Sequence, residues 1–542
     1  MQSMGNTSSL RNLKQNSENG NIFSTFQLYE LSLLSKSSDL IEKKNYYFQK
    51  CVEFLETTTQ KHDNTNDYIS PKNQFILDSL VLKDIRKFHS FKTKFERDLT
   101  VIIGENGSGK TTILECIAKS LSWIVAGLIK ENANGDRIGY SDIKNEAEDY
   151  GEIQTNFKFG EQRCSGSIAR AIKGMSEKKD SSVSDLKFLA GIWRVINNQQ
   201  LINLPLFIFY SAKRFIGEFD RTSEQIKDRE NRFDVYNQCL KNEIKFIDFK
   251  QWFIYLYKKG KNIHSNDANG LLEKKIKLIL HKQGQNATSL LSLLEEHFQV
   301  DDVNLNAEKN NALDKIKTLQ KAITECIPEI KEIYVDISSG VDEIYVHINE
   351  KKININQLSD GQRTFLGIVA DLTYRLLVLN PNLENPLNGQ GIVLIDEIEL
   401  HLHPKWQQQI LINLTKIFPN IQFIVTTHSP QVLSTVYKRQ IRQLIELAND
   451  DYDVQQPELQ TRGVMSSDIL ERIMGTYSIP DVKESNDLNK LQQYIQEDKY
   501  NTPEAELLYD SLKKHFGDKH PEMLNCDRLI QFRKLIAKNK FR

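Results

Sequence analysis

The segment VIIGENGSGKTTILECI, residues 101–117, constrains the fold of this chain more than any other. An apolar strand, expected at 99–103, runs into a glycine-rich turn, and the turn opens an apolar helix. From Gly104 to Thr111 the turn matches G-x-x-x-x-G-K-[ST], in the strand-turn-helix context that this phosphate-binding motif requires. The sequence therefore predicts an α/β fold with a phosphate-binding loop between a buried strand and the helix that follows it.

Each residue type in this loop has a chemical reason to be there. Glycines let backbone N–H groups wrap phosphates, and the helix N-terminus adds positive potential. Lys110 is expected to reach the β- and γ-phosphates, and the Thr111 hydroxyl can hold Mg²⁺. The residues expected to bind the nucleotide are Gly104, Glu105, Asn106, Gly107, Ser108, Gly109, Lys110, Thr111 and Thr112. The predicted cofactors are ATP and Mg²⁺.

A second strand pattern, GIVLIDE at 391–397, is apolar and ends in two acids. Asp396 suits a carboxylate on the Mg²⁺ side, so Thr111 and Asp396 are the candidate metal ligands. Glu397 suits a carboxylate that orients or activates the attacking water. Phosphoryl transfer needs positioning and charge more than covalent help from the protein, and these two acids can supply both. We therefore expect Glu397 and Lys110 to be catalytic.

Two more segments complete a recognisable set of motifs. LSDGQR at 358–363 opens a helix before the acid-ended strand, and TTHSP at 426–430 follows the next strand. With the phosphate loop, they resemble the ABC-type ATPase head of transporters, SMC and Rad50 proteins, RecF and OLD-like proteins. The resemblance covers roughly 75–220 and 331–435, and implies a head of two lobes.

The resemblance also implies roles in trans. In that family the signature segment, here 358–363, closes over the nucleotide of a second head, so Ser359 and Gly361 would contact its γ-phosphate. His428 matches the histidine that senses γ-phosphate, which makes it the third expected catalytic residue, although a lone histidine at a strand end often has only a structural role. A homodimer or higher oligomer formed through the heads is therefore expected.

Two positions depart from the family pattern. Asp360 stands where transport ATPases usually have glycine, so its carboxylate either lies near the phosphates and slows turnover or points outward. Ser211 stands where the glutamine of the Q-loop is expected, and Gln154 is a weak alternative. We assign the Q-loop role to neither residue.

The stretch LIDEIELHLHP, 394–404, raises the question of a zinc site. A zinc helix of the H-E-x-x-H type needs its ligands on one helix face, whereas Glu399, His401 and His403 follow a strand and run into Pro404. That pattern fits a loop leading to the first turn of a helix. In the ABC family this loop crosses the dimer interface, so we expect the three residues to lie between subunits.

The sequence of 394–430 is similar to the OLD/RecF-like branch. The overall layout, with TRGVMSSDIL after the head and then a helical tail, resembles the PtuA-like ATPases of Septu anti-phage systems, especially their retron-associated form. The resemblance implies an HNH nuclease partner of the PtuB type and, in a retron, a reverse transcriptase with its multicopy single-stranded DNA (msDNA). Acids in LIEL and NDDYD lack the second strand that an OLD-type nuclease domain needs, so we expect no nuclease within the chain.

These patterns suggest five regions, listed in chain order: a polar, partly disordered extension with two helices (1–70), the first half of the head (71–220), a helical insertion (221–330), the second half of the head (331–450) and a C-terminal helical, partner-binding region (451–542) that starts as an acidic loop.

The charge balance and the cysteine pattern limit the possible partners and the cellular compartment. A formal net charge of −1 gives the whole chain no bias toward polyanions, so any nucleic-acid surface is local. The candidates are the insertion, with 14 Lys/Arg against 10 Asp/Glu in 221–300, and the basic tail at 527–542; solvated helix faces explain both as well. Six scattered cysteines without a CxxC pair argue against disulfides and indicate a reducing cytoplasm, and we expect no membrane insertion.

Two rival functions stay open at this point. A repair ATPase of the RecF or Rad50 type would bind DNA directly, with DNA-stimulated hydrolysis and a steep salt dependence. A structural sensor would bind ATP and hardly turn it over, which a carboxylate at Asp360 near the phosphates could cause.

Overall fold

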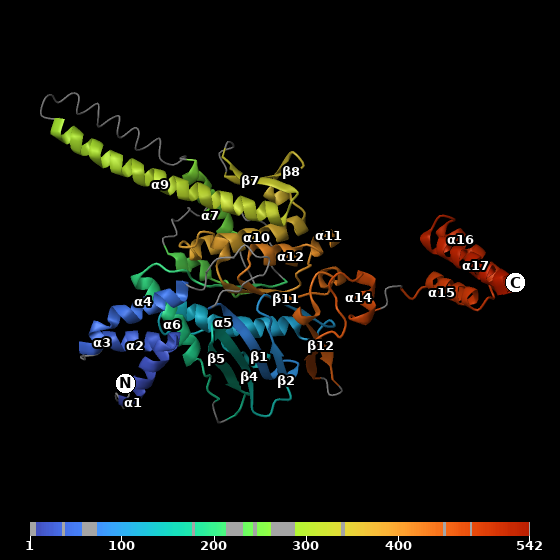
Figure 1. The fold of residues 1–542 in the computed structure, drawn as a ribbon, viewed down its shortest axis with the longest axis horizontal. Helices are drawn as coiled ribbons and strands as arrows, with labels where there is room; N and C mark the ends of the chain where they lie inside the picture. The colour runs from blue at the N-terminus through green and yellow to red at the C-terminus, as the bar shows by residue number, and fades with distance from the viewer. Residues whose placement is uncertain are drawn as a thin grey trace. The chain divides into compact units, whose positions relative to one another are not determined.

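The computed structural model describes residues 7–34, 38–56, 73–175, 179–212, 231–241, 247–261, 288–337, 342–447, 451–476 and 480–540. The chain forms two compact units, Met1–Val464 and Met465–Arg542. The predicted α/β fold is confirmed and lies in the first unit (Figure 1).

A six-stranded sheet carries the predicted motifs. Its strands are β3 (Leu99–Ile103), β6 (Leu206–Tyr210), β10 (Gly391–Ile395), β11 (Ile421–Thr426), β12 (Ile441–Glu446) and β13 (Tyr452–Gln455), in the order β13-β12-β3-β11-β10-β6. All neighbours are parallel except the β12–β13 pair. Every residue of β3, β6, β10 and β11 is buried, as in parallel sheets covered on both faces. The parallel strands therefore end at one edge of the sheet, where their loops meet.

A second sheet is antiparallel and packs against the first. It consists of β1 (Phe75–Ile85), β2 (Phe88–Lys94), β4 (Tyr150–Phe159) and β5 (Gln162–Ala171), in the order β2-β1-β4-β5. The buried Gln422 amide on β11 joins the sheets: its oxygen accepts from Leu77 N–H at 2.8 Å, and its nitrogen donates to Leu77 O at 2.9 Å and Glu96 O at 2.8 Å. A buried amide with its bonds satisfied fixes the relative register of the two sheets.

Helix α5 (Lys110–Ile129) lies between the two sheets, where it contacts β6, β10 and β11 as well as β4 and β5. Its neighbour α6 (Ser184–Gln199) approaches so closely that a Cβ at Gly127 would lie 2.7 Å from Ala190 Cβ. Among the described residues, α5 is the one helix long and apolar enough to cross a membrane, and 72% of its most apolar stretch is buried. Its hydrophobicity is therefore that of a core helix.

The N-terminal region holds four described helices, so the expectation of two was wrong. They are α1 (Thr7–Glu18), α2 (Ile22–Leu34), α3 (Ser38–Glu42) and α4 (Lys44–Glu56). Phe26 of α2 is buried, and its ring lies 5.4 Å from that of Phe188 on α6. Burial against the head stabilises α2 as a helix. Its Ser and Thr residues interrupt the apolar face, so the sequence pattern alone did not predict this helix.

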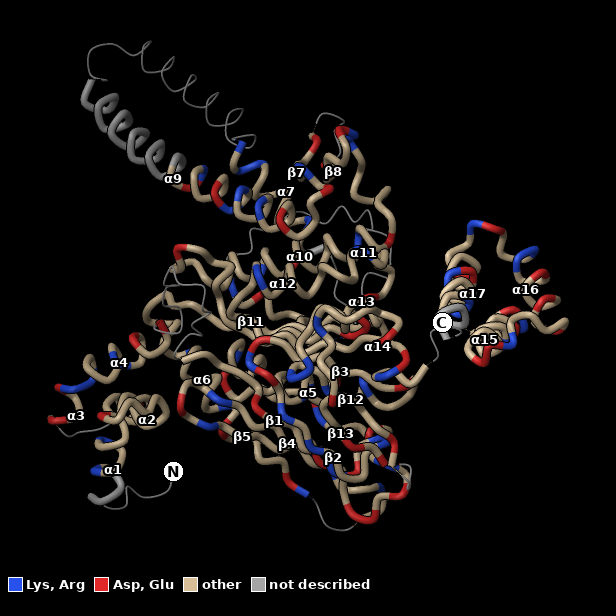
Figure 2. Tube along the Cα trace, turned by 45° about the vertical axis from the view of Figure 1, so that its right-hand side comes forward, with Lys and Arg blue, Asp and Glu red and all other residues tan. Residues whose placement is uncertain are grey.

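The described part of the insertion is helical. α7 (Ile247–Gly260) packs beside α9 (Thr288–Cys326), and both contact α10 (Asp360–Leu379), as Figure 1 shows. A three-stranded sheet follows: β7 (Ile330–Asp336), β8 (Glu343–Ile348) and β9 (Lys351–Asn354). Lys/Arg and Asp/Glu residues are interspersed along α7 and the coloured part of α9 in Figure 2. Much of the basic stretch counted in 221–300 lies outside the described residues.

Short helices lie in the loops of the head: η2 (Tyr140–Asp142), η3 (Arg232–Tyr236), η5 (Ile355–Gln357), η6 (Pro386–Asn388), α11 (Pro404–Gln407), α12 (Ile410–Ile417), α13 (Pro430–Leu433) and η7 (Lys438–Gln440). All six cysteines are free and buried, and burial raises the pKa of the Cys116 thiol to about 12.

Two expectations for the C-terminal region need correction. The stretch expected as an acidic loop contains strand β13, which pairs with β12, so the missing second strand exists but belongs to the head's sheet. The compact C-terminal unit starts at Met465 and contains α14 (Ser466–Arg472), α15 (Lys483–Gln496), α16 (Pro503–Phe516) and α17 (Pro521–Lys540). The residues that form its core are Leu488, Leu491, Ile495, Ala505, Leu512, Met523 and Cys526.

A buried ion pair anchors α10 to the main sheet. Arg375 Nε donates to both carboxylate oxygens of Asp371, at 3.0 and 2.9 Å, and the side chains are 3% and 1% exposed. Tyr210 of β6 donates its hydroxyl to Asp371 at 2.8 Å, and Arg375 also donates to the carbonyl of Val235. Each charge is thus surrounded by hydrogen bonds, which a charge at this depth requires.

We predict that Arg375→Met destabilises the protein by about 3–5 kcal/mol, because it leaves the Asp371 carboxylate buried without its cation. Denaturant and thermal unfolding measure the change. Lys317→Met is the control, since its pair with Asp314 is exposed on both sides. The double variant Asp371→Leu/Arg375→Met should lose less than Arg375→Met alone. Equal unfolding midpoints for Arg375→Met and Lys317→Met would contradict the prediction.

Candidate functional site

The phosphate loop lies between β3 and α5, as predicted. Gly109 precedes the helix with φ 97°, in the left-handed region that favours glycine. A Cβ there would lie 2.6 Å from Phe88 Cζ, so no larger side chain fits without displacing that ring. Ser108 is buried, and its Oγ has no hydrogen-bond partner among the described residues. A buried hydroxyl of this kind in the loop suits contact with a phosphate oxygen.

The Lys110 ammonium lies within the loop and faces acids. It donates to the carbonyls of Gly104 at 3.0 Å and Glu105 at 2.7 Å. Burial lowers the pKa of Lys110, while the nearby carboxylates of Asp396 and Glu397 act in the opposite direction. The loop therefore presents one positive charge, held on backbone carbonyls, where an anionic ligand would lie.

Asp396 follows β10 directly and is held by two hydroxyls. Thr111 Oγ1 donates to one carboxylate oxygen at 2.9 Å, and Thr426 Oγ1 donates to the other at 2.6 Å. Asp396 is 2% exposed, and its backbone N–H donates to Tyr210 O at 2.8 Å. A hydroxyl and a carboxylate in contact beside a phosphate loop form the oxygen-only donor set that Mg²⁺ prefers, so the residues fit that ion.

Glu397 adopts an unusual backbone conformation. Its φ is 47°, in the left-handed region, where a residue with a Cβ costs about 1–2 kcal/mol. Its N–H donates to Thr426 Oγ1 at 2.7 Å, and the N–H of Ile398 donates to Thr426 O at 3.0 Å. The end of β11 therefore fixes the strained turn, which directs the chain away from the sheet immediately after the two acids.

His428 lies at the same edge, beyond β11, and Glu399 holds its backbone. The Glu399 carboxylate accepts from His428 N–H at 2.5 Å and from Thr427 Oγ1 at 2.7 Å. Burial lowers the pKa of His428, and the Lys110 ammonium lowers it further. Within the chain, the Glu399 carboxylate turns toward two donors of the loop after β11, and its expected place between subunits stays a prediction.

The signature segment caps α10. Ser359 is the N-cap: its Oγ accepts from Gln362 N–H at 3.3 Å, and its own N–H donates to Gln362 Oε1 at 3.2 Å. Asp360 is 68% exposed and forms an ion pair with Arg363 one turn later on the same helix. Within one chain the Asp360 carboxylate points to solvent, and its distance from the phosphates of a second head stays a prediction.

Gly361 brings α10 against the loop that follows Glu397. A Cβ at Gly361 would lie 2.2 Å from His401 O, so this contact admits no side chain. The two segments line a hollow of about 550 Å³. The residues around it are Glu329, Ser359, Asp360, Gly361, His401, His403, Lys405 and Trp406.

The histidines of this loop do not assemble a metal cage. His403 is the N-cap of α11: its Nδ1 accepts from Lys405 N–H at 3.3 Å, and Pro404 follows at the first helical position. Among the described residues, no group of three or more His, Cys, Asp or Glu side chains could hold a metal ion. The structure thus gives His403 a capping role at the predicted loop-to-helix boundary.

The structure therefore separates the predicted residues into two groups. The residues at the edge of the main sheet are Gly104 to Thr112, Asp396, Glu397 and His428. Ser359 and Gly361 lie instead in the hollow beside His401. Ser211 is buried at the end of β6, next to the strand that bears Asp396, whereas Gln154 is exposed on β4 in the other sheet. Position thus favours Ser211 over Gln154 as the residue near the acids.

Sequence reasoning missed two residues here. Thr426 positions both acids, but a threonine at the end of an apolar strand gives no separate signal. Arg86, in the turn between β1 and β2, donates to Thr112 Oγ1 at 3.2 Å and to Asp142 at 2.9 Å. An arginine beside the first turn of α5 adds positive charge near the loop, and its link to Thr112 spans 26 residues of sequence.

Comparisons with known proteins agree with this geometry. Residues 75–433 match the AAA ATPase domain family. The chain is 32% identical to the retron Vc95 probable ATPase of Vibrio cholerae serotype O1 biovar El Tor, over 77% of this chain and 82% of that protein. It is 30% identical to the retron Ec83 probable ATPase of Escherichia coli, over 90% and 95%. Septu protein PtuA of Bacillus thuringiensis is 25% identical over 74% and 84%.

We predict that Thr426→Val lowers ATP turnover about 10-fold to 100-fold without unfolding the protein, because it removes the hydroxyl that orients Asp396 and the Glu397 N–H. Steady-state hydrolysis rates measure the effect. Thr415→Val is the matched control, since its hydroxyl bonds only to carbonyls of its own helix. Equal turnover in the two variants would show that Thr426 does not position the acids.

Proposed function

Because this chain belongs to the AAA ATPase domain family and, within it, to the retron- and Septu-type ATPases, we propose that it binds ATP with Mg²⁺, hydrolyses the nucleotide, and controls a partner nuclease in anti-phage defence. The observation that carries the hydrolytic part is the contact of Thr111 and Thr426 with Asp396, beside the Lys110 ammonium. It puts a hydroxyl, a carboxylate and a fixed positive charge at one edge of the sheet.

Each residue at the edge of the main sheet has its own role in the proposed hydrolysis. The loop N–H groups and Lys110 bind the β- and γ-phosphates, and Thr111 with Asp396 holds Mg²⁺. When bound, Mg²⁺ neutralises charge on the phosphates. Glu397 orients the attacking water, and its strained turn keeps the carboxylate just beyond Asp396. His428 contacts the γ-phosphate through its ring, and burial lowers the pKa of that ring.

A second copy of the chain completes the site. Ser359 caps the 20-residue helix α10, and the exposed Ser359 and Asp360 can approach a phosphate only from a surface of the head. Among the described residues, the hydrogen bonds of Ser359 are to its own helix, and Gly361 packs on His401 rather than on the phosphate loop. We therefore propose a homodimer or higher oligomer in which the hollow faces the nucleotide of the other subunit.

The C-terminal unit offers a surface for a protein partner. Met523 and Cys526 bury one face of α17 in the core of the unit. On another face, Leu524, Phe532 and Leu535 recur at helical spacing and are 41%, 60% and 60% exposed. One apolar face of α17 is thus buried in the core of the unit, and the other is exposed and available to a partner. We propose that this face binds an HNH nuclease of the PtuB type, in a cytoplasmic assembly that also holds a reverse transcriptase and msDNA.

For hydrolysis, we predict that purified wild type turns over ATP, that Lys110→Ala fails to bind it, and that Glu397→Gln binds it with turnover reduced about 100-fold or more. Equilibrium binding of a labelled ATP analogue and phosphate release measure the two steps. Glu446→Gln, an exposed position at the end of β12, is the control. Wild-type turnover no faster than that of Glu397→Gln would instead favour the structural sensor.

For the partner surface, we predict that Phe532→Asp with Leu535→Asp abolishes copurification with the proposed PtuB-type HNH nuclease, because two carboxylates in an apolar interface lose their hydration. ATP turnover should stay at the wild-type level. The control is Asn525→Asp, which adds a charge at an exposed position of the same helix. Undiminished copurification, or neighbouring genes that encode neither an HNH nuclease nor a reverse transcriptase, would contradict this part of the proposal.

A further inference from the structure

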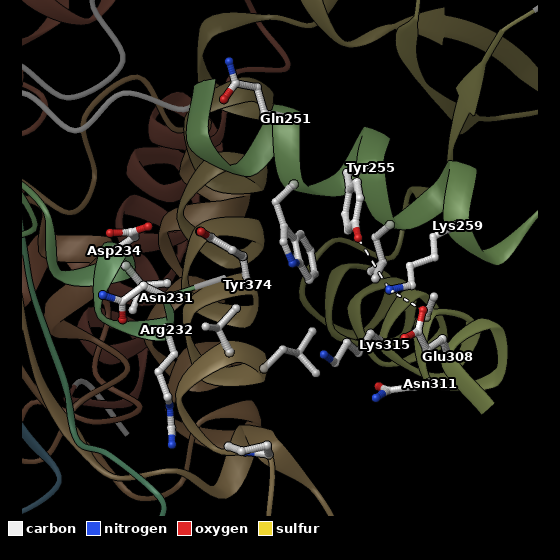
Figure 3. Close-up of a pocket in the computed structure, with 17 residues that line it drawn as sticks. Asn231, Arg232, Asp234, Gln251, Tyr255, Lys259, Glu308, Asn311, Lys315 and Tyr374 are labelled. Atoms are coloured by element: carbon white, nitrogen blue, oxygen red, sulfur yellow. Dashed lines mark hydrogen bonds and ion pairs between the residues drawn. The ribbon is translucent and has the colours of Figure 1, made fainter. Parts of the chain in front are cut away.

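A cavity of about 310 Å³ lies where the helical insertion meets the ATPase head (Figure 3). Its walls come from four elements far apart in the sequence: η3, α7, α9 and α10. The volume is at the lower end of the range for small-molecule sites and suits one small ligand rather than a chain. None of the residues that line it belongs to the phosphate loop or to the signature segment.

The cavity combines flat rings with an apolar floor. Trp252 of α7 packs on Tyr374 of α10 with ring centroids 4.8 Å apart, and Tyr255 lies one turn further along α7. Leu256 and Leu377 add aliphatic surface between them. Rings of this kind bind planar heteroaromatic groups by stacking and edge contacts.

Positive charge lines the same cavity. Figure 3 shows Arg232 on one side and Lys315, Lys259 and Glu308 on the other, with the Lys315 ammonium turned toward α10. Lys259 is paired with Glu308 at 2.9 Å. In the described part of the chain, Lys315 has no hydrogen bond or ion pair, whereas the Arg232 guanidinium already donates to Asn197 and to the carbonyls of Ile202 and Leu379 and has only its Nε without a partner. Burial and the Lys259 ammonium both lower the pKa of Lys315, and a bound anion would offset both effects.

We propose that this cavity is a second ligand site, which takes a mononucleotide-class molecule: a planar heteroaromatic ring against the aromatic wall of Trp252, Tyr255 and Tyr374, with a phosphate on Lys315. The ring matches the aromatic wall, and the phosphate supplies the charge partner that Lys315 lacks. The site lies outside the nucleotide site of the head, so it can exist whether or not the proposed hydrolysis occurs.

A continuous series of contacts leads from the cavity to the acids of the head. The carbonyl of Val235, a residue of the cavity wall, accepts from Arg375. Arg375 binds Asp371, Asp371 accepts from the Tyr210 hydroxyl, and Tyr210 O accepts from Asp396 N–H at 2.8 Å. A ligand that shifts the cavity wall therefore acts on groups bonded to the strand that bears Asp396, and we infer that it changes ATP turnover.

The test measures binding of adenosine, guanosine, cytidine and uridine 5′-monophosphates to the full-length chain by equilibrium dialysis. Lys110→Ala disables the phosphate loop in this background, so binding there reports the second site. We expect saturable binding of at least one monophosphate that weakens about 10-fold or more in Lys315→Met and not in Lys317→Met, since a charge-assisted hydrogen bond is worth that factor. Unfolding midpoints of both variants establish that they fold.

Three results would overturn the proposal. The first is the absence of saturable binding of any monophosphate up to about 10 mM, a concentration at which a small-molecule site of this size should be occupied. The second is equal binding by Lys315→Met and Lys317→Met. The third is competition by inorganic phosphate alone that is as strong as competition by the monophosphate. In the Lys110-containing chain, the ligand should change ATP turnover in wild type and Lys317→Met but not in Lys315→Met. Unchanged turnover at saturating ligand would overturn the coupling.

Discussion

The carboxylate of Asp396 is the group on which the candidate site depends. It accepts from Thr111 at the start of α5 and from Thr426 at the end of β11, while its own backbone N–H donates to the end of β6. These contacts can form together only if β3, β6, β10 and β11 run parallel and end at one level of the sheet, which the observed register provides. The buried apolar strands thus hold three residues at one level of the sheet: Tyr210 at the end of β6, Asp396 after β10 and Thr426 at the end of β11.

Helix α10 is the second structural requirement, because it touches that arrangement at two points. At its N-terminus Gly361 packs on the carbonyl of His401, four residues beyond Glu397. Near its middle, Asp371 binds the hydroxyl of Tyr210, whose carbonyl in turn accepts from Asp396. A partner that presses on the first turn of α10 therefore acts on both the loop after the acids and the strand beside them, with no flexible segment between.

The local motifs were predictable, whereas the contacts between them were not. A glycine-rich turn between strand and helix and an apolar strand ending in two acids are patterns of adjacent residues, so the sequence identified β3, α5 and β10 without knowledge of the fold. The hydrogen bonds of Glu399 to the loop after β11 were not predictable, because the direction of its side chain depends on a turn with positive φ at Glu397 and His401, which periodicity does not encode. Thr426 was missed because its acceptor lies 30 residues away in sequence.

The base of the insertion packs on α10, the helix that bears the signature segment. α7 and α9 wall a cavity together with η3 and α10, and the stacking of Trp252 on Tyr374 joins the insertion to the helix that bears the signature segment. Displacing α7 would expose those rings and loosen η3, whose Val235 carbonyl is one of the acceptors of the buried Arg375. A buried cation that loses an acceptor is costly, so the position of the insertion and the anchoring of α10 must change together. A displacement of α7 therefore has a physical route to the strand that bears Asp396 that needs no rearrangement of the sheet.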